Sequence, residues 1–413
     1  MKIGFVGLGK LGLPCALAIE SKGHEVKGYD LSPRVDEIVR SKELPYREVG
    51  VQELLEKSNL AICDLPEVVN WADLIFVAVQ TPHESIYEGD EPLPETRSDF
   101  CYEHLVHAVE RISHELKTRK PVVIISTVLP GTIRRLVLPV AGENMGLCYN
   151  PFFIAMGTTV NDFLYPEFVL FGKHSVDAQA VAEDFYRTIT DAPFFSTTIE
   201  NAELIKVAYN TFIGMKVVFA NTLMEICHKI PNTDVDAVTD ALFLAKRRLI
   251  SPAYMRGGMG DGGGCHPRDN IAMSWLAREL NLSHDLFTDI MQAREDQTMF
   301  LADLIIDQHR KTGLPIMLLG QAYKPETNLT IGSPASLLHE LIAARGYDAD
   351  MYDPFIHRGL LINIPRLYFI STRHEEWRTW DFPSGSVVID PWRYLQVKER
   401  HVKYIPVGRG SND

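Results

Sequence analysis

The stretch KIGFVGLGKLG, Lys2 to Gly12, decides the fold expected for the first part of this chain. A short apolar run leads directly into three glycines with G-x-G-x-x-G spacing, Gly7, Gly9 and Gly12, and the residues that follow have helical character. A second strand is expected over 25–29, and it ends at Asp30, 18 residues after Gly12. Strand, glycine turn, helix, strand and acid is the order of a dinucleotide-binding βαβ unit.

Each part of this unit has a physical role in holding a dinucleotide. The glycines permit a tight turn, close approach of a pyrophosphate and close packing of helix on strand. A carboxylate at Asp30 would accept the ribose hydroxyls of NAD and repel the 2′-phosphate of NADP, so we expect NAD as the cofactor. A glycine turn with only a packing role is the alternative. The expected cofactor site comprises Gly7, Gly9, Lys10, Leu11, Gly12, Asp30, Arg34, Thr81, Pro82 and Thr127.

Composition and charge limit the class of protein. A chain of 413 residues exceeds what one core usually holds and predicts two or three domains. A net charge of −13 argues against a partner of duplex nucleic acid. The six cysteines lie far apart with no CxxC pair, no signal peptide is recognisable, and no apolar run reaches the roughly 18 residues of a membrane span. We therefore expect a cytoplasmic enzyme with reduced thiols, no metal and no membrane partner.

The order of elements predicts an α/β fold in three parts. Strands are expected at 74–79, 122–126 and 168–171, and an acidic, proline-bearing stretch at 84–98 is interpreted as a surface loop. Further helices are expected at 235–248, 270–282, 285–312 and 334–344, with strands at 315–319, 348–352 and 387–390. The predicted domains are an N-terminal Rossmann-type doubly wound sheet (1–198), a central helical domain with a long connecting helix over 199–230 (199–300), and a smaller C-terminal α/β domain (301–413).

Five further stretches give the chain a family resemblance. They are QTP at 80–82, STVLPGT at 126–132, NAELIKVAYN at 201–210, GDGGGCHPRD at 260–269 and LGQAYKPET at 319–327. In this order, and with the glycine turn, they resemble the nucleotide-sugar dehydrogenases, which include the UDP-glucose, GDP-mannose and UDP-N-acetylhexosamine dehydrogenases. The resemblance runs nearly end to end.

The resemblance implies an activity and partners. It implies oxidation of the C6 alcohol of a nucleotide sugar, with a UDP-sugar favoured, to the carboxylate of a uronic acid, using two NAD per sugar. A cysteine thiolate captures the aldehyde as a thiohemiacetal, which is oxidised to a thioester that water hydrolyses. The family also implies a homodimer through the long central helix, or a higher homo-oligomer, and a supply of uronic acids for polysaccharide biosynthesis.

The resemblance assigns the reactive cysteine and an oxyanion pair. Cys265 stands among glycines, between an acidic and a basic residue, and matches the family's nucleophile; a small buried thiol is the alternative. Gly262 to Gly264 are expected to clear space for the hexose and the nicotinamide. Lys206 and Asn210, four residues apart on one helix face, match a pair that stabilises negative charge on the C6 oxygen. An exposed Lys–Asn pair on a solvated helix is the alternative.

Two further residues are assigned to proton transfer and to water. Asp269 matches an aspartate that works with the lysine and a water, although an acid here could equally cap a helix starting at Asn270. Thr127 would hold the catalytic water; a turn former at a strand end is the alternative.

The expected substrate site draws on residues scattered along the chain. Lys324 and Arg393 match basic residues near the sugar nucleotide, and Arg248 and Arg256 precede the cysteine in a loop that binds phosphate and sugar. Solvated surface arginines are the alternative for all three arginines. The expected substrate-binding residues are Phe152, Phe153, Met156, Lys206, Asn210, Arg248, Tyr254, Arg256, Gly262, Lys324 and Arg393.

The chain departs from the family pattern at positions that bear on hydrolysis. Where most members read NPEFLAEG, this chain reads NPFFIAMG, so Phe152 and Met156 replace glutamates that assist thioester hydrolysis and hold substrate. An apolar pair there predicts a drier, narrower pocket. The stretch NLTIG at 328–332 replaces an acidic and arginine-bearing one, and Arg268 replaces a lysine.

These departures leave several hypotheses open. The enzyme forms the usual acid, acts on an unusual sugar nucleotide, or stops before the free acid. A two-electron hydroxyacid-type dehydrogenase of the 6-phosphogluconate type and a non-catalytic regulator that binds NAD or sugar nucleotide are the competing classes. The cysteine loop and the C-terminal α/β unit argue against the first, and the combination of Cys265, Lys206, Asn210 and Asp269 argues against the second.

Overall fold

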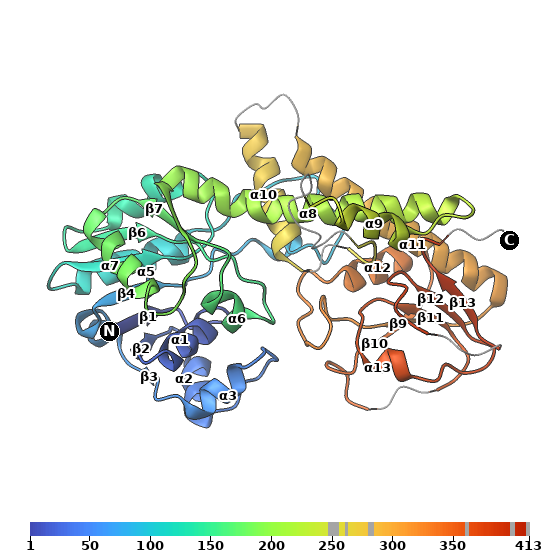
Figure 1. The fold of residues 1–413 in the computed structure, drawn as a ribbon, viewed down its shortest axis with the longest axis horizontal. Coiled ribbons are helices and arrows are strands. Elements are labelled where there is room, and N and C mark those ends of the chain that lie inside the picture. Colours follow the sequence, from blue (N-terminus) through green and yellow to red (C-terminus); the bar gives the residue numbers. More distant parts are fainter. Residues whose placement is uncertain (247–255, 261–262, 280–284, 360–362, 397–400, 410–413) are drawn as a thin grey trace. The chain divides into compact units, whose positions relative to one another are not determined.

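Two compact units make up the chain (Figure 1). The computed structural model describes residues 1–246, 256–260, 263–279, 285–359, 363–396 and 401–409. Unit 1 consists of residues 1–82 and 99–209, and unit 2 of residues 83–98 together with the chain from 210 onward. The boundary at 209/210 lies inside helix α8 (Ile199–Lys229). The division into three domains at 198/199 and 300/301 stays a prediction beside this grouping.

Unit 1 is built on an eight-stranded sheet with the strand order β3-β2-β1-β4-β5-β6-β7-β8. Neighbouring strands run parallel except β6 and β7. The strands are β1 (Lys2–Val6), β2 (Glu25–Tyr29), β3 (Ala61–Ile62), β4 (Leu74–Val77), β5 (Lys120–Ile124), β6 (Met145–Tyr149), β7 (Val169–Lys173) and β8 (Phe194–Thr198). The chain builds outward from β1 in one direction and then from β4 in the other, so the topological switch point lies between these two strands.

Helices cover both faces of this sheet, which confirms the predicted doubly wound fold. Phe5 lies against Gly12 at the start of α1, whereas the next position back, Gly4, lies against Val68 and Ala72 at α4. Because successive strand residues point to opposite faces, α1 and α4 lie on opposite sides of the sheet. The helices of unit 1 are α1 (Gly12–Ser21), α2 (Pro33–Ser41), α3 (Val51–Lys57), α4 (Leu65–Trp71), α5 (Glu103–Glu115), α6 (Thr159–Leu164) and α7 (Val176–Tyr186), with helical turns η2 (Ile133–Val137) and η3 (Leu138–Val140).

Unit 2 contains a five-stranded parallel sheet with the order β10-β9-β11-β12-β13. Its strands are β9 (Ile316–Leu319), β10 (Ala349–Tyr352), β11 (Leu367–Ile370), β12 (Val387–Asp390) and β13 (Lys403–Pro406). Alternate strand residues enter two different cores: Leu318 and Phe369 face α11 and α12, while Leu319 and Tyr368 face Trp377. The sheet is thus buried on both faces, as parallel sheets usually are.

The helices of unit 2 start where the sequence provides caps. The Asp285 side chain accepts the N–H of Thr288 at the start of α11, and Ser333 accepts the N–H of Ala335 at the start of α12. Gly313 ends α11 in a left-handed conformation. The helices are α9 (Val235–Phe243), α10 (Cys265–Glu279), α11 (Leu286–Thr312), α12 (Pro334–Ala343) and α13 (Glu376–Thr379), with the short turn η1 (Ser85–Tyr87).

The stretch 84–98, expected as a surface loop, is largely irregular and mostly exposed or half-buried, and the structure groups it with unit 2. Tyr87 is buried and forms a small apolar core with Ile271 of α10 and Met291 of α11. Arg294 donates to the carbonyl of Gly89 (2.8 Å). Tyr87 and the Gly89 carbonyl therefore anchor an otherwise largely exposed loop in unit 2.

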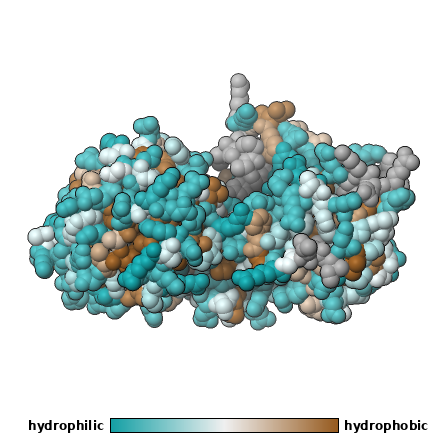
Figure 2. All heavy atoms as spheres, turned by 90° about the horizontal axis from the view of Figure 1, so that it is seen from below, coloured by the Kyte–Doolittle hydropathy of each residue, from teal (hydrophilic) through white to brown (hydrophobic). Residues whose placement is uncertain are grey.

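The distribution of polar and apolar residues on the surface is that of an ordinary globular protein. Figure 2 shows one face on which hydrophilic residues predominate and apolar residues appear in small, separate patches. Within the described residues, no helix is both long enough and apolar enough to cross a bilayer.

Candidate active site

The glycine turn of unit 1 is shaped to admit a phosphate group. Gly7 has φ +90°, and a Cβ there would lie 2.7 Å from the carbonyl oxygen of Ala78. A Cβ on Gly12 would lie 2.1 Å from the carbonyl oxygen of Gly7, so α1 can begin close to β1 only with glycine. Gly9 faces open space, since its nearest neighbour is the Gln80 side chain at 3.8 Å. This cradle at the start of α1 fits the pyrophosphate of a dinucleotide.

The Asp30 carboxylate is tied to the same turn. Its Oδ2 accepts the N–H of Leu8 (2.6 Å) and its Oδ1 accepts the N–H of Ser32 (2.8 Å). Each carboxylate oxygen can accept a second bond, so Asp30 remains able to receive two ribose hydroxyls. Lys10 and Arg34 are both exposed, on the turn and on α2 respectively.

The loops that follow β4 and β5 are joined to one another. The hydroxyl of Thr81 donates to the carbonyl of Thr127 (2.7 Å), and that of Ser126 donates to the carbonyl of Val79 (2.5 Å). Thr81 is buried and Thr127 half-buried. Because β4 is the neighbour of β1, these loops and the glycine turn occupy the same carboxyl edge of the sheet, which is the ligand edge of a doubly wound fold.

The predicted oxyanion pair is buried rather than solvated. Lys206 and Asn210 lie in α8 and are only 7% and 9% exposed, so the alternative of an exposed pair is wrong. The Lys206 ammonium lies 5.3 Å from the ring centroid of Phe153, whose ring in turn packs edge-on against Tyr209 at 4.7 Å. A cation over an aromatic face is held electrostatically where few waters reach it.

The cysteine stands at the very start of a helix. Helix α10 begins at Cys265, not at Asn270 as the sequence suggested. The histidine and proline that follow Cys265 were taken for loop residues, but proline is well tolerated in a first helical turn. Cys265 is exposed, whereas Asp269, one turn along, is fully buried. Because Asp269 lies inside the helix, its interpretation as a cap is wrong too.

Two donors hold the buried carboxylate of Asp269. The Asn210 amide donates to its Oδ2 (2.5 Å), and the guanidinium of Arg268 lies 3.2 Å from its Oδ1. Two residues predicted for catalysis, far apart in sequence, are thereby brought into direct contact within unit 2. A buried carboxylate without such partners would be strongly disfavoured.

The glycines before the cysteine receive a neighbouring loop. A Cβ on Gly263 would lie 3.0 Å from the Tyr323 ring, and a Cβ on Gly332 would lie 2.1 Å from the Cα of Gly264. The loop 320–332 therefore packs directly onto the cysteine loop. Space for the hexose and nicotinamide at these glycines stays a prediction; the structure shows that part of the space serves backbone packing. Gly262 lies outside the described residues.

The predicted substrate arginines have different surroundings. Arg248 and Tyr254 lie outside the described residues. Arg256 is exposed, pairs with Asp240 (3.3 Å) and lies over the ring of Phe243. Arg393 is internal: its guanidinium donates to the Asp236 carboxylate (3.0 Å) and to the carbonyls of Pro391, Val407 (2.8 Å) and Gly257 (2.7 Å). Its contact with a nucleotide stays a prediction, and what the geometry provides is an anchor for the segment before the cysteine.

The apolar replacements lie in different surroundings. Phe152 is 8% exposed and packs against Phe163 (centroids 5.3 Å apart) and Phe76 (6.3 Å). It also lines, with Phe153 and Phe168, a small pocket of unit 1. Met156 is half-buried in the turn before α6. Phe152 therefore belongs to the aromatic core of unit 1, and the drier, narrower pocket expected from the apolar pair stays a prediction.

One buried residue beside Asp269 escaped sequence analysis. His83 is 8% exposed, and burial first, then the charge of Arg268, lowers the pKa of its imidazole to about 4. Its ring packs edge-on against Tyr87 (centroids 5.8 Å apart). Its position directly after the QTP stretch was the only signal in the sequence.

Comparison with known proteins identifies the family. Residues 1–190 match the NAD-binding domain of the UDP-glucose/GDP-mannose dehydrogenase family, and residues 200–295 match the central domain of the same family.

The chain belongs to the UDP-glucose/GDP-mannose dehydrogenase family.

Named relatives agree with this membership in the UDP-glucose/GDP-mannose dehydrogenase family. The chain is 30% identical over 367 residues to a GDP-mannose 6-dehydrogenase of Pseudomonas aeruginosa, covering 86% of this chain and 81% of that one. It is 28% identical over 364 residues to a UDP-glucose 6-dehydrogenase of Bacillus subtilis, covering 86% and 76%. A solved UDP-glucose dehydrogenase from Pyrobaculum islandicum superposes with a TM-score of 0.85 at 26% identity, covering 99% and 98%.

Family membership sets the general chemistry of this UDP-glucose/GDP-mannose dehydrogenase homologue. It is an NAD-dependent oxidoreductase of the nucleotide-sugar 6-dehydrogenase class. The glycine cradle and Asp30 fit that cofactor. Among the described residues, no group of three or more His, Cys, Asp or Glu side chains is arranged to hold a metal ion.

Proposed function

We propose that this chain oxidises the C6 primary alcohol of a UDP- or GDP-sugar to the carboxylate, through a covalent thioester on Cys265. The observation that carries the proposal is the arrangement of α10. Cys265 is its exposed first residue, and Asp269, one turn along, is held by Asn210. The positive end of the helix dipole lies at Cys265 and favours negative charge on the sulfur.

Residues of unit 1 would hold the cofactor. The cradle around Gly7, Gly9 and Gly12 would receive the pyrophosphate, and Asp30 the ribose hydroxyls. Bound NAD supplies a hydride acceptor for C6 in each of the two oxidations.

The proposed reaction takes place in four steps at C6 of the sugar and at the sulfur of Cys265. The C6 hydroxyl loses a proton as C6 loses a hydride, which gives the aldehyde. The thiolate adds to C6, forming a C–S bond, and the oxygen takes up a proton to give the thiohemiacetal. Loss of that proton and a second hydride gives the thioester. Water then attacks C6 and gives up its two protons, the C–S bond breaks, and the carboxylate and the thiolate are released.

The charged and polar residues are proposed to act on the oxygen at C6. Lys206 would stabilise its developing negative charge, together with Asn210. An amide nitrogen carries two hydrogens, so that of Asn210 can bind Asp269 and the sugar oxygen together. Asp269 would accept protons, and Thr127 would hold a water. Because Phe152 and Met156 bear no carboxylate, activation of the hydrolytic water is assigned to Asp269.

The test measures NADH released per limiting sugar nucleotide. The panel contains UDP-glucose, UDP-N-acetylglucosamine, UDP-N-acetylmannosamine and GDP-mannose. About two NADH per sugar would support full oxidation to the acid and name the substrate. About one would show that the reaction stops before the acid, and no NADH from any of the four would contradict the proposed substrate class.

We also propose that α8 forms a homodimer contact. Phe212, Met215 and Phe219 are 40%, 37% and 49% exposed and lie three and four residues apart, on one face of the helix. Large apolar side chains gathered on one face favour a protein partner. Light scattering should give the mass of a dimer or larger oligomer, and Phe219→Glu should lower it; a monomeric wild type would contradict the proposal.

A further inference from the structure

Three adjacent strands of unit 2 bring a buried, hydrogen-bonded pair of an aspartate and a histidine to the loop that carries Lys324. The loop 320–332 follows β9, Asp353 follows β10, and His374 lies shortly after β11. These strands are parallel neighbours in the order β10-β9-β11, so their carboxyl ends meet at one edge of the sheet. The side chains of Asp353 and His374 are both fully buried.

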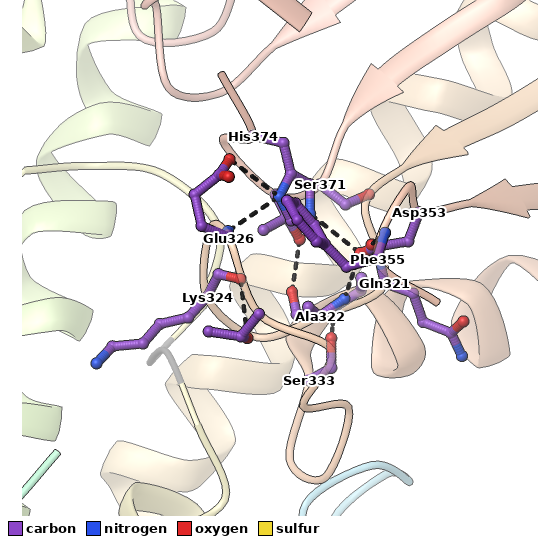
Figure 3. Close-up of polar contacts among 12 residues, drawn as sticks. Gln321, Ala322, Lys324, Glu326, Ser333, Asp353, Phe355, Ser371 and His374 are labelled. Atoms are coloured by element: carbon purple, nitrogen blue, oxygen red, sulfur yellow. Dashed lines mark hydrogen bonds and ion pairs between the residues drawn. The ribbon is translucent and has the colours of Figure 1, made fainter. Parts of the chain in front are cut away.

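Asp353 fixes the start of the loop. Its Oδ2 accepts the N–H groups of Gln321 (2.7 Å) and Ala322 (2.8 Å) and a bond from Nε2 of His374 (3.0 Å) (Figure 3). Burial alone would raise the pKa of this carboxyl, but these bonds, that from His374 foremost, hold it below its usual value. The hydroxyl of Thr372 adds a bond to the Ala322 carbonyl (2.6 Å).

His374 fixes the far side of the same turn. Its Nδ1 accepts the backbone N–H of Glu326 (3.1 Å). Because a backbone N–H only donates and a carboxylate only accepts, the two bonds together require a neutral ring with its hydrogen on Nε2. Glu326 adopts φ 60°, a left-handed conformation that is uncommon without glycine and that this bond helps to hold.

Lys324 lies midway between the two fixed points, Ala322 and Glu326. Figure 3 shows its side chain extending away from the Asp353–His374 pair. The same loop packs Tyr323 and Gly332 onto the glycines that precede Cys265. A shift of this turn would therefore move both Lys324 and the backbone beside the cysteine.

We propose that Asp353 and His374 are positioning residues that hold Lys324 in place for the sugar nucleotide. The pair acts through the backbone of the turn, at Ala322 on one side of the lysine and Glu326 on the other. The inference rests on the proposed function, because it assigns the lysine to that substrate.

The first test compares steady-state kinetics. His374→Phe removes both ring bonds, His374→Gln keeps a donor toward Asp353, and Asp353→Asn removes the charge. We expect His374→Phe and Asp353→Asn to raise KM for the sugar nucleotide roughly tenfold, with KM for NAD unchanged, and His374→Gln to recover part of the loss. His339→Gln is the matched control, because His339 bonds the Ala349 carbonyl and contacts none of these groups. Equal KM values in His374→Phe and wild type would overturn the proposal.

A double-mutant cycle separates positioning from a general structural effect. If His374 acts through Lys324, KM of the double variant Lys324→Met/His374→Phe should equal that of Lys324→Met alone. Effects that multiply would mean that the pair acts by another route, and the proposal would fail.

Hydrogen exchange gives a readout that does not depend on the reaction. Exchange at Gln321, Ala322 and Glu326 should be faster in His374→Phe and Asp353→Asn, with other amides of unit 2 unchanged. Unchanged exchange would contradict the proposal that Asp353 and His374 hold this turn. If these variants show faster exchange but the wild type oxidises none of the panel sugars, the hold of Asp353 and His374 on the turn is supported. The proposed function is then contradicted instead.

Discussion

Asn210 and Asp269 are joined by a hydrogen bond of 2.5 Å between the amide Nδ2 and the carboxylate Oδ2. One residue comes from the long helix α8 and the other from the first turns of the cysteine helix α10. The bond orients a fully buried carboxylate one turn from Cys265. This orientation bears on the proton-accepting role proposed for Asp269, since a misplaced base loses most of its effect.

Asn210→Ala should therefore impair the enzyme in two ways. Leaving the Asp269 carboxylate with one fewer donor should cost about 1–3 kcal/mol of unfolding free energy. Turnover should fall by about a hundredfold, the usual worth of one oxyanion donor. Asn201→Ala, on the exposed part of the same helix, is the control and should change neither quantity. Urea unfolding and kcat measure the two; normal kcat in Asn210→Ala would contradict its role.

Cys265→Ser should abolish acid formation. The serine hydroxyl cannot form a thioester, so the yield should fall from about two NADH per sugar to one at most. The control is Cys101→Ser, since Cys101 is another exposed thiol among the described residues. Product analysis by mass spectrometry checks the outcome, and a Cys265→Ser enzyme that still makes the carboxylate would refute covalent capture.

Asp30→Asn should weaken the preference for NAD over NADP. Removing the negative charge removes the repulsion of a 2′-phosphate while keeping an oxygen for the bond from Leu8. We expect KM for NAD to rise about tenfold and NADP to become a detectable substrate, since one charged hydrogen bond is worth about 1.5–3 kcal/mol. Asp36→Asn, a half-buried position on α2 paired with Arg40, is the control. An unaltered cofactor preference would count against the assignment.

Phe152 should matter for stability before it matters for catalysis. Its ring contacts Phe76 and Phe163 in the core of unit 1, so Phe152→Ala should cost about 3 kcal/mol. Restoring the family's acid with Phe152→Glu should cost at least as much, because it buries a carboxylate among aromatic rings. Phe195→Ala, at a position 53% exposed, should change little. Denaturant titration decides; a Phe152→Glu protein as stable as wild type would show that the ring is not needed there.

His83 should make the protein less stable in mild acid. Its pKa is about 4 in the folded protein and about 6.5 when unfolded, so the unfolded chain binds the extra proton as pH falls through this window. Stability present above pH 6.5 is thus lost progressively toward pH 4, by about 3 kcal/mol. Arg268 and Asp269 are the charged groups that face the ring. Both are present in His83→Gln and in the wild type, so their own contributions to the pH dependence of stability largely cancel in the comparison. Unfolding free energies at pH 7 and pH 5 should differ less in His83→Gln; an identical difference would contradict the assignment.

The sequence predicted what local patterns determine. The glycine turn, the strand before Asp30 and the helix expected over 334–344 follow from spacing and residue type, and each lies within a residue of where it was expected. The long helix could be bounded to within a residue, because no proline or glycine pair interrupts its apolar spacing before Lys229.

What escaped prediction depends on contacts between distant segments. The helix expected from Asn270 begins at Cys265, and the residues near its start pack against Tyr87 and the loop 320–332. The partnership of Asp353 with His374 joins residues that share no motif and meet only because β10 and β11 flank β9. The spacing of residues along the sequence does not indicate such long-range contacts.

The assignment of residues 83–98 to unit 2 has a consequence for how the protein is made. The chain passes from unit 1 to unit 2 after Pro82, returns at Asp99 and leaves again after Tyr209. The small core around Tyr87 can therefore form only after Ile271 and Met291 have been synthesised. A fragment cut after Tyr209 would carry an orphaned apolar segment, and one beginning at Asn210 would lack it. Neither unit can therefore be obtained whole by a single truncation, and the contacts of residues 83–98 can form only after α11 has been synthesised.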